Sequence, residues 1–171
     1  YFNWALIIIW VTCSIALLPQ PVSAGTIEDI ARGDLAWAQR AEGHQGSRAA
    51  AEPIEKAISA YRIALQTEPE NLEARWKLLR AFYFKGEFVL EKRERLDLFE
   101  EGREIAKTGI SQIEQTYGFD KSLFRMKPGE LANAVDKDVL VGEVFFWGSA
   151  SWGLWGQYSG KLIAALQHAV D

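Results

Sequence analysis

The residues with the most distinctive chemistry lie on one predicted helix, Leu72–Lys85. Trp76, Arg80 and Tyr83 follow one another at spacings of four and three residues, so they share a helix face, and Glu73 lies one turn earlier. An arginine binds a carboxylate through two parallel hydrogen bonds, and flanking aromatic rings can cover the apolar part of a ligand. This face is a candidate site for an acidic or amphipathic ligand. The alternative is that Trp76 belongs to the core and that the Arg80 stem simply covers it.

A second candidate site is an aromatic and glycine-rich helix near the end of the chain, Phe145–Gly156. Glycine is a poor helix former, so Gly148 and Gly153 within a helix indicate either a close helix contact or a ligand cavity. In the first case the tryptophans are core residues, and a membrane-spanning helix is disfavoured because Glu143 and several serines interrupt the apolar run. The large rings that would line a cavity are Phe146, Trp147, Trp152 and Trp155.

Residues typical of catalysis are few. The only histidines are His44, in a glycine-containing loop, and His168, near the end of a helix. No spacing typical of a catalytic triad, a metal site or a phosphate-binding loop is present. Acidic pairs such as Glu100–Glu101 fit the solvated face of a charged helix. The sequence therefore predicts a binding protein without catalytic residues, metal or cofactor.

Composition is that of an ordinary globular protein. The 171 residues are 49% hydrophobic and 25% charged, with a formal net charge of −4. Basic and acidic side chains are interspersed, so a nucleic-acid partner is not expected.

The elements that position these residues are all predicted to be helices, because strand-like alternation is absent and good helix formers recur at helical spacing. Thr26 and Asp29 resemble a capping box that opens the first helix. The predicted ranges are 26–42, a second helix to residue 67 with Pro53 in its first turn, 72–85 closed by Gly86, 89–117, and a last hairpin of 139–155 with 159–170 joined at Gly156-Gln157. Residues 118–138 are expected to be mostly loop, with one turn at Pro128.

The stretch from Pro53 to Phe88 resembles a boundary between two tetratricopeptide repeats. Ala57, Tyr61 and Ala64 occupy the small, aromatic and small positions of a second repeat helix, and Leu78, Phe82 and Gly86 match the next first helix. Arg75 and Leu79 depart from the usual Trp and Gly. The fold class expected from this resemblance is an all-α irregular solenoid of stacked antiparallel helical hairpins, with Ala57, Tyr61, Ala64, Leu78 and Phe82 buried together.

A more particular resemblance is to the T-component family of TRAP transporters. It is carried by Arg75–Gly86, by the aromatic-glycine segment Phe145–Gly156 and by the long insertion between these repeat-like regions. The resemblance implies a periplasmic, non-enzymatic helical protein that associates with a solute-binding protein and passes a small organic acid. The alternative function is a general protein-interaction scaffold of the cell envelope, and both leave the oligomeric state open.

The first 24 residues are expected to form a separate segment. Tyr1–Ala24 carries no charged side chain, and its apolar run is followed by Pro19, Pro21 and the small-residue site Val22-Ser23-Ala24. This order is typical of a secretory signal peptide cleaved after Ala24, which leaves residues 25–171 as the helical domain, incomplete at its C-terminus, and places the protein outside the cytoplasm. The alternative is a membrane anchor, for which the run is short.

Cys13, the only cysteine, offers a third possibility for this segment. As a lipid-bearing residue it would tether the protein to a membrane, although the preceding Trp10-Val11-Thr12 fits a lipoprotein signal poorly. Membrane contact is therefore expected only through the signal segment or such an anchor.

Overall fold

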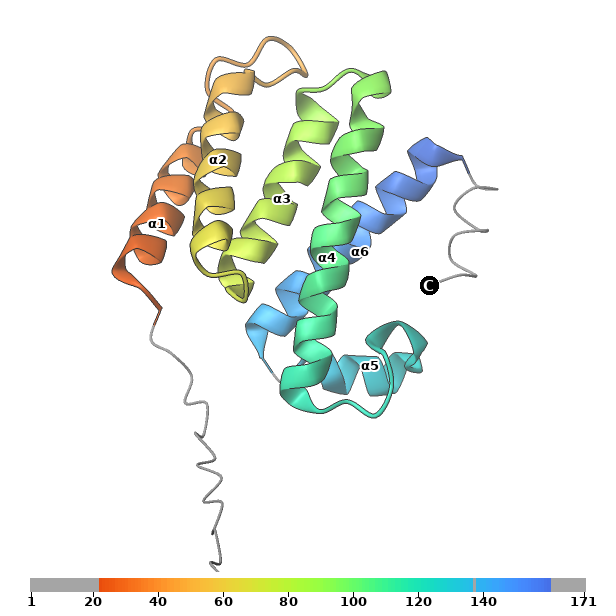
Figure 1. The fold of residues 1–171 in the computed structure, drawn as a ribbon. Helices are drawn as coiled ribbons and strands as arrows, with labels where there is room; N and C mark the ends of the chain where they lie inside the picture. Colours follow the sequence, from red (N-terminus) through yellow and green to blue (C-terminus); the bar gives the residue numbers. More distant parts are fainter. Residues whose placement is uncertain (1–21, 137, 161–171) are drawn as a thin grey trace, which may run out of the picture.

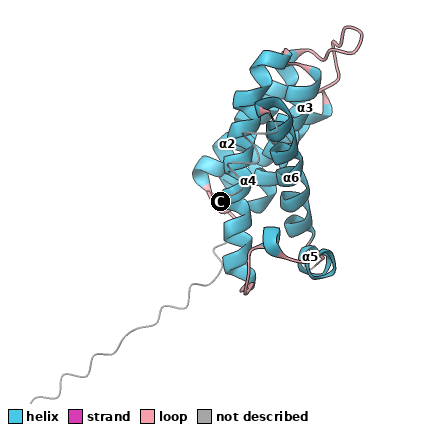
Figure 2. Ribbon diagram, turned by 90° about the vertical axis from the view of Figure 1, so that its right-hand side faces the viewer, coloured by secondary structure: helices cyan, strands magenta, loops and turns pink. Residues whose placement is uncertain are grey.

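The computed structural model describes residues 22–136 and 138–160, and within these ranges the regular structure is entirely helical. Six α-helices and two short 3-10 helices follow one another along the chain (Figures 1 and 2). Their bounds are α1 Ala24–Ala38, α2 Ala51–Thr67, α3 Leu72–Phe88, η1 Lys92–Glu94, α4 Arg95–Tyr117, η2 Leu123–Arg125, α5 Pro128–Val135 and α6 Val139–Ser159. The all-α class predicted from the sequence is confirmed.

Helices α1 to α4 lie side by side in chain order, each running back against its predecessor (Figure 1). α6 crosses behind α4 and packs on both α3 and α4, while α5 lies at one end of the stack (Figures 1 and 2). α3 is therefore central, because it contacts α2, α4 and α6. The predicted site residues on α3 are thus placed between the first hairpin and the aromatic helix.

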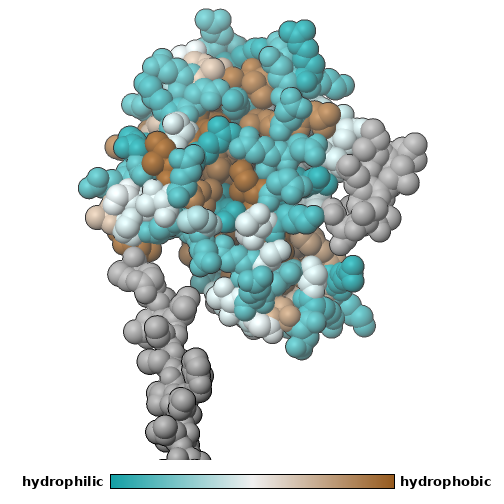
Figure 3. All heavy atoms as spheres, viewed as in Figure 1, coloured by the Kyte–Doolittle hydropathy of each residue, from teal (hydrophilic) through white to brown (hydrophobic). Residues whose placement is uncertain are grey.

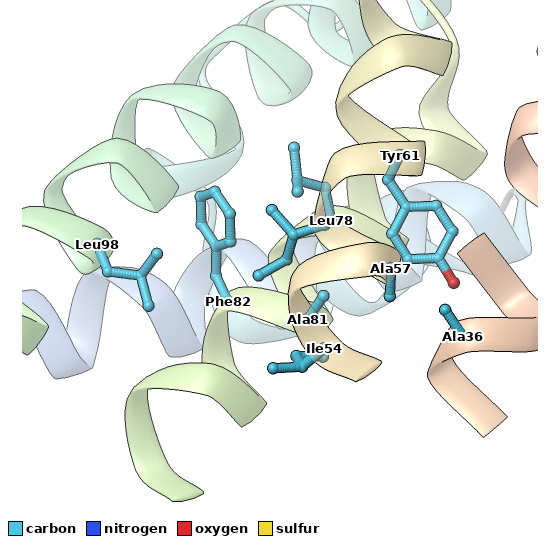
Figure 4. Close-up of a cluster of buried hydrophobic side chains, with 9 residues drawn as sticks. Ala36, Ile54, Ala57, Tyr61, Leu78, Ala81, Phe82 and Leu98 are labelled. Carbon is cyan, nitrogen blue, oxygen red and sulfur yellow. The ribbon is translucent and has the colours of Figure 1, made fainter. Parts of the chain in front are cut away.

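The core between α1, α2 and α3 is built from small and aromatic side chains in alternation (Figure 4). The five residues predicted to be buried are all at most 1% exposed: Ala57, Tyr61, Ala64, Leu78 and Phe82. Four of them belong to this core, and Ala64 lies in a smaller buried cluster with Ile30 and Ala74. The ring of Tyr61 reaches α1 and lies directly against Gly33, where any added side-chain carbon would collide with it. Small residues on one helix thus admit the aromatic ring of the next, as the sequence pattern indicated.

Several predicted helix ends were wrong. α1 starts two residues earlier than expected, because Ser23 rather than Thr26 is its N-cap: the Ser23 hydroxyl accepts the Thr26 backbone N–H at 3.2 Å, and α1 ends at Ala38 instead of Glu42. The fourth helix is divided into η1 and α4. The segment 118–138 contains η2 and the whole helix α5 rather than a single turn.

Two glycines predicted to end helices lie inside them. α3 continues through Gly86 to Phe88, because Gly86 lies against the ring of Phe99 on α4 and serves close packing rather than capping. α6 likewise continues through Gly156 to Ser159. The chain leaves the helix at Gly160, whose φ of 91° is in the left-handed region that glycine tolerates best. The predicted helix 159–170 lies, after Gly160, outside the described residues.

The predicted signal-peptide cleavage site after Ala24 falls in the first turn of α1, which begins at Ala24. Ser23 caps α1, and its backbone N–H donates to the Glu68 carboxylate in the turn between α2 and α3. Ser23 is therefore attached to the helical domain by these hydrogen bonds, although residues 22–24 are exposed; residues 1–21 of the segment expected to be separate lie outside the described part. In the described ranges, no helix has the length and apolar character needed to cross a membrane.

The core assignment predicts a large loss of stability when the Tyr61 ring is removed. Tyr61→Ala is expected to lower the free energy of unfolding by about 3–5 kcal/mol, since it empties a fully buried site between three helices. Ile63→Ala, on the same helix but 40% exposed, is the control and should change it by less than about 1 kcal/mol. Urea unfolding followed by circular dichroism measures both, and similar losses for the two variants would contradict the assignment.

Candidate functional site

The predicted face of α3 forms an arginine–tryptophan cluster with α1. The guanidinium group of Arg80 lies 4.0 Å from the ring centroid of Trp37 on α1 and 4.7 Å from that of Trp76 on α3. A second guanidinium, that of Arg40, lies 4.2 Å from the Trp37 centroid and donates a hydrogen bond to the Trp37 carbonyl at 3.0 Å. Such cation–π contacts gain about 0.5–2 kcal/mol, and most when the cation is partly desolvated. The cluster therefore consists of Trp37, Arg40, Trp76 and Arg80.

Both cations of this cluster lack an acidic partner. Among the described residues, no carboxylate lies within salt-bridge distance of Arg40 or Arg80. The Arg80 Nε and the Trp76 Nε1 are buried without a hydrogen-bond partner. Burial lowers the pKa of Arg80 from its ordinary value, but a guanidinium group remains charged at physiological pH. Two positive charges are thus concentrated at one place without a carboxylate in direct contact, and Asp34 is the nearby acid that favours the charge on Arg80.

A polar network beneath the cluster sets its geometry. The Tyr61 hydroxyl, from α2, donates to the Asp34 carboxylate at 2.8 Å, and Lys77 Nζ lies 2.6 Å from the other Asp34 oxygen. Lys77 Nζ also lies 2.7 Å from Glu73. Burial, together with the hydrogen bond to Asp34, raises the pKa of Tyr61 well above its ordinary value, so this hydroxyl stays protonated. The network joins α1, α2 and α3 one turn away from Arg80.

Glu73 was predicted to share a site with Arg80, but the structure separates them. Glu73 pairs with Lys77 and lines a hollow of about 430 Å³ between α1 and the start of α3. The walls of the hollow are mostly apolar, with Asp34 and Glu73 as its charged members; the lining residues are Val22, Ile27, Ile30, Ala31, Asp34, Asn71 and Glu73. Helix α3 therefore contributes to two neighbouring features of opposite charge.

The Tyr83 ring contacts α6, whereas the Arg80 side chain contacts α1. Its ring meets that of Trp147 edge to face with centroids 5.6 Å apart, and Trp147 meets Phe146 in the same way at 5.0 Å. Trp147 Nε1 donates to Glu143 at 3.0 Å. The Phe146 side chain is 61% exposed. The structure therefore places Tyr83 with Phe146 and Trp147 of α6, whereas Arg80 packs on Trp37 of α1.

The other two aromatic residues predicted for the α6 site lie elsewhere. Trp155 is 3% exposed, donates from Nε1 to Glu100 at 3.0 Å and is covered by Arg103, so it is a core residue at the contact with α4. Trp152 is half-buried and meets Phe124 of η2 at 4.6 Å. Successive helix residues differ by about 100° in direction, which places Trp147 and Trp152 on different sides of α6.

The two glycines of α6 have different surroundings. A side-chain carbon at Gly148 would lie 2.9 Å from Cβ of Ala106, so this glycine permits the close contact between α6 and α4. Nothing lies within 4 Å of such a carbon at Gly153. The tight-packing alternative therefore explains Gly148, and Gly153 is not required by such a contact among the described residues.

Sequence reasoning missed two members of the cluster, Trp37 and Arg40, and Asp34 of the polar network beneath it. Asp34 and Trp37 are spaced by three residues, as are their contact partners Lys77 and Arg80, and this matching spacing is the one available signal. It connects residues 43 positions apart, so it becomes useful only once α1 and α3 are known to be neighbours.

Comparison of the chain with protein-family models, curated proteins and solved structures gave no match. In residues 22–136 and 138–160, no group of three or more His, Cys, Asp or Glu side chains is arranged to hold a metal ion. The site is therefore described by its own geometry. Two arginines without a carboxylate partner lie on tryptophan rings, and an apolar hollow with Asp34 and Glu73 in its lining lies nearby.

The different surroundings of the α6 glycines give a paired prediction. Gly148→Ala should destabilise the protein by about 1–3 kcal/mol, because the added methyl group overpacks the contact with Ala106. Gly153→Ala should be neutral or stabilise by up to about 1 kcal/mol through its better helix propensity. Thermal unfolding of the two variants measures the difference, and destabilisation by Gly153→Ala would show an unrecognised contact there.

Proposed function

We propose that this chain is an exported, non-enzymatic helical-repeat protein that binds an acidic or amphipathic ligand through the arginine–tryptophan cluster. The supporting observation is that Arg80 is held between two tryptophan rings with no carboxylate partner among the described residues. Arg80 is half-buried, and a guanidinium group in such a place is stabilised by a negative charge in contact with it, since uncompensated charge is unfavourable in a protein interior. A bound anion would supply the missing partner.

The repeat assignment is supported by the packing of α1 to α4. The small, aromatic and small positions of α2 are buried against α1 and α3, and the chain order of the helices is also their spatial order (Figure 1). In a tetratricopeptide array the first helices of successive hairpins line a common face. α1 and α3 hold those places here, and all four cluster residues lie on or just beyond them.

A finer proposal is that the protein is a periplasmic accessory component of a TRAP-type solute transporter. It is supported by the aromatic surface that Tyr83 forms with Trp147 and the exposed Phe146 of α6, which is the kind of surface that binds a partner protein. In such a protein the arginine pair would hold the carboxylate of a small organic acid and a solute-binding protein would be the partner. Pull-down from a periplasmic extract should then recover a solute-binding protein.

The alternative, a general interaction scaffold, is favoured by exposed apolar side chains away from the cluster. Val139 is 75% exposed, Phe146 61% and Phe124 40%. Exposed aromatic residues are typical of protein interfaces. A scaffold should lose its partners on Phe146→Ser and keep them on Arg80→Ala, whereas the proposed ligand-binding protein should lose its ligand on Arg80→Ala.

The proposed function predicts that binding needs the planar guanidinium group of Arg80, which can form two parallel hydrogen bonds, and not only its positive charge. With octanoate as an amphipathic acid probe, Arg80→Ala should weaken binding by roughly tenfold to a hundredfold, the range for a hydrogen bond to a charged group. Arg80→Lys should also weaken it, because an ammonium group cannot form the paired contact. Isothermal titration calorimetry measures the affinities.

The control for this experiment is Arg32→Ala, which removes an exposed arginine of α1 that pairs with Asp29. It should leave octanoate binding unchanged. Loss of folding in Arg80→Ala together with unaltered octanoate binding by Arg80→Lys would show that Arg80 is structural, and the ligand-binding function would then be rejected.

A further inference from the structure

The outer face of α1 carries an apolar stripe that no described segment covers. α1 lies at the edge of the stack and packs mainly on α2, through the face that holds Gly33 and Ala36 (Figure 1). On the opposite face, apolar residues recur every three or four positions and are exposed, with Ile27 56% and Leu35 72% exposed. We call this face the α1 stripe and define it by five residues: Ala24, Ile27, Ala31, Leu35 and Ala38.

The α1 stripe has the form of a helix–helix contact. Apolar side chains that are exposed singly are common on protein surfaces, but here they follow one side of the helix for about 21 Å. A helix at the end of a repeat array normally turns a polar face to the solvent. α1 does the reverse, so its outer face is suited to a second helix with an apolar stripe of its own.

The five residues of the stripe are arranged symmetrically about Ala31. Counted from Ala24, the spacings are three, four, four and three residues, and alanines alternate with large aliphatic side chains. When a second stripe runs antiparallel and is centred on the same residue, Ala24 lies level with Ala38 of the other copy. Ile27 lies level with Leu35 in the same way. The alanines allow the two helices to approach closely, and the large side chains of one copy can pack over the alanines of the other.

The charged residues beside the stripe are also complementary to a reversed copy. Glu28 and Arg32 lie four residues apart along one edge of the stripe, and both are exposed. In an antiparallel helix pair the same edge of each copy meets its counterpart in reverse order. Glu28 of one copy therefore comes within reach of Arg32 of the other, and the symmetry gives this ion pair twice. Arg32 also pairs with Asp29 of its own helix, but its side chain is 60% exposed and has further donors for a second carboxylate.

We propose that α1 pairs with α1 of a second copy of this chain, antiparallel and about a two-fold axis at Ala31. The contact is one helix wide and smaller than the roughly 800 Å² per partner of a standard interface, so the dimer is reversible, with a dissociation constant in about the micromolar range. The dimer is independent of the proposed ligand binding. Trp37 lies about 120° around α1 from Ala31, so pairing through the stripe leaves the arginine–tryptophan cluster uncovered.

Cysteine cross-linking tests the position and direction of the pairing. In a Cys13→Ser background of the intact chain, Ala31→Cys should give a disulfide-linked dimer under mild oxidation, because Ala31 meets its own copy at the axis. Leu35→Cys should not, because its two copies would lie about 12 Å apart along the helices, whereas a disulfide joins Cα atoms about 4.4–6.8 Å apart. Ser59→Cys, at an exposed position of α2, is the matched control and should also remain monomeric on non-reducing gels.

Sedimentation velocity over a range of protein concentrations tests the contribution of the stripe and of its charged edge. Leu35→Glu should raise the dissociation constant of the dimer at least about tenfold, because it places a charge within an apolar contact. Ile63→Glu, at an exposed apolar position of α2, is the control and should leave the constant unchanged. Glu28→Arg alone should weaken the dimer, and adding Arg32→Glu should restore it, since the double exchange recreates both ion pairs. Octanoate binding should be the same in Leu35→Glu as in the original chain.

Each result supports or overturns the pairing. A chain that is monomeric at every concentration, with no more cross-linking of Ala31→Cys than of Ser59→Cys, would overturn it and leave the stripe to the segment before Val22 or to a partner protein. A dimer that Leu35→Glu does not weaken would also overturn it, as would cross-linking of Leu35→Cys as complete as that of Ala31→Cys. None of these results would change the octanoate measurements, which test the ligand-binding function separately.

Discussion

The position of the Tyr61 side chain determines most of what surrounds the candidate site. Its ring fills the gap between α1 and α2 that Gly33 leaves open, and its hydroxyl holds Asp34 (Figure 4). Asp34 in turn holds Lys77 of α3. One side chain of α2 thereby fixes both the separation and the register of α1 and α3. Without that register Trp37 would not face Arg80, and the arginine–tryptophan cluster would not form.

The retention of charge on Arg80 follows from the same arrangement. Partial burial removes water from the guanidinium group and lowers its pKa, which is unfavourable for the charged form. The two indole rings present their electron-rich faces to it and offset part of this desolvation, and the nearby Asp34 favours the charge as well. Arg80 is thus kept in place by rings that leave its hydrogen-bonding capacity incompletely used. This distinguishes it from Arg75, whose buried guanidinium group donates to the carbonyls of Ile105 and Pro69 and ties α3 to its surroundings.

The sequence predicted the parts of the structure that depend on local spacing. The buried positions of α2 and α3 follow from the alternation of small and aromatic residues, and the shared face of Trp76 and Arg80 follows from helix periodicity. What it did not predict depends on contacts between distant segments. Glycine is typical of helix ends, so Gly86 and Gly156 were predicted to end helices. Gly86 instead lies inside α3, where the Phe99 ring of the next helix leaves no room for a side chain. The partner of Arg80 on α1 was likewise missed, because the loop between α1 and α2 obscures the repeat period that would have aligned Trp37 with it.

The surface distribution of side chains is consistent with a site at the arginine–tryptophan cluster and a separate surface on α6. Hydrophilic residues cover most of the face seen in Figure 3, with apolar residues in separate patches. α6 differs from the other helices because it is apolar around much of its circumference, and it packs on α3 and α4 along its length and meets Phe124 of η2 through Phe145 and Trp152. Its close approach to α4 depends on small residues at each crossing, with Gly102 against Ser151 and Ala106 against Gly148. Those contacts bring Trp147 to Tyr83, so that α3 contacts the aromatic residues of α6 through Tyr83 and Trp37 of α1 through Arg80. A ligand held by Arg80 and a protein bound on α6 would therefore lie on opposite neighbours of the same central helix, α3.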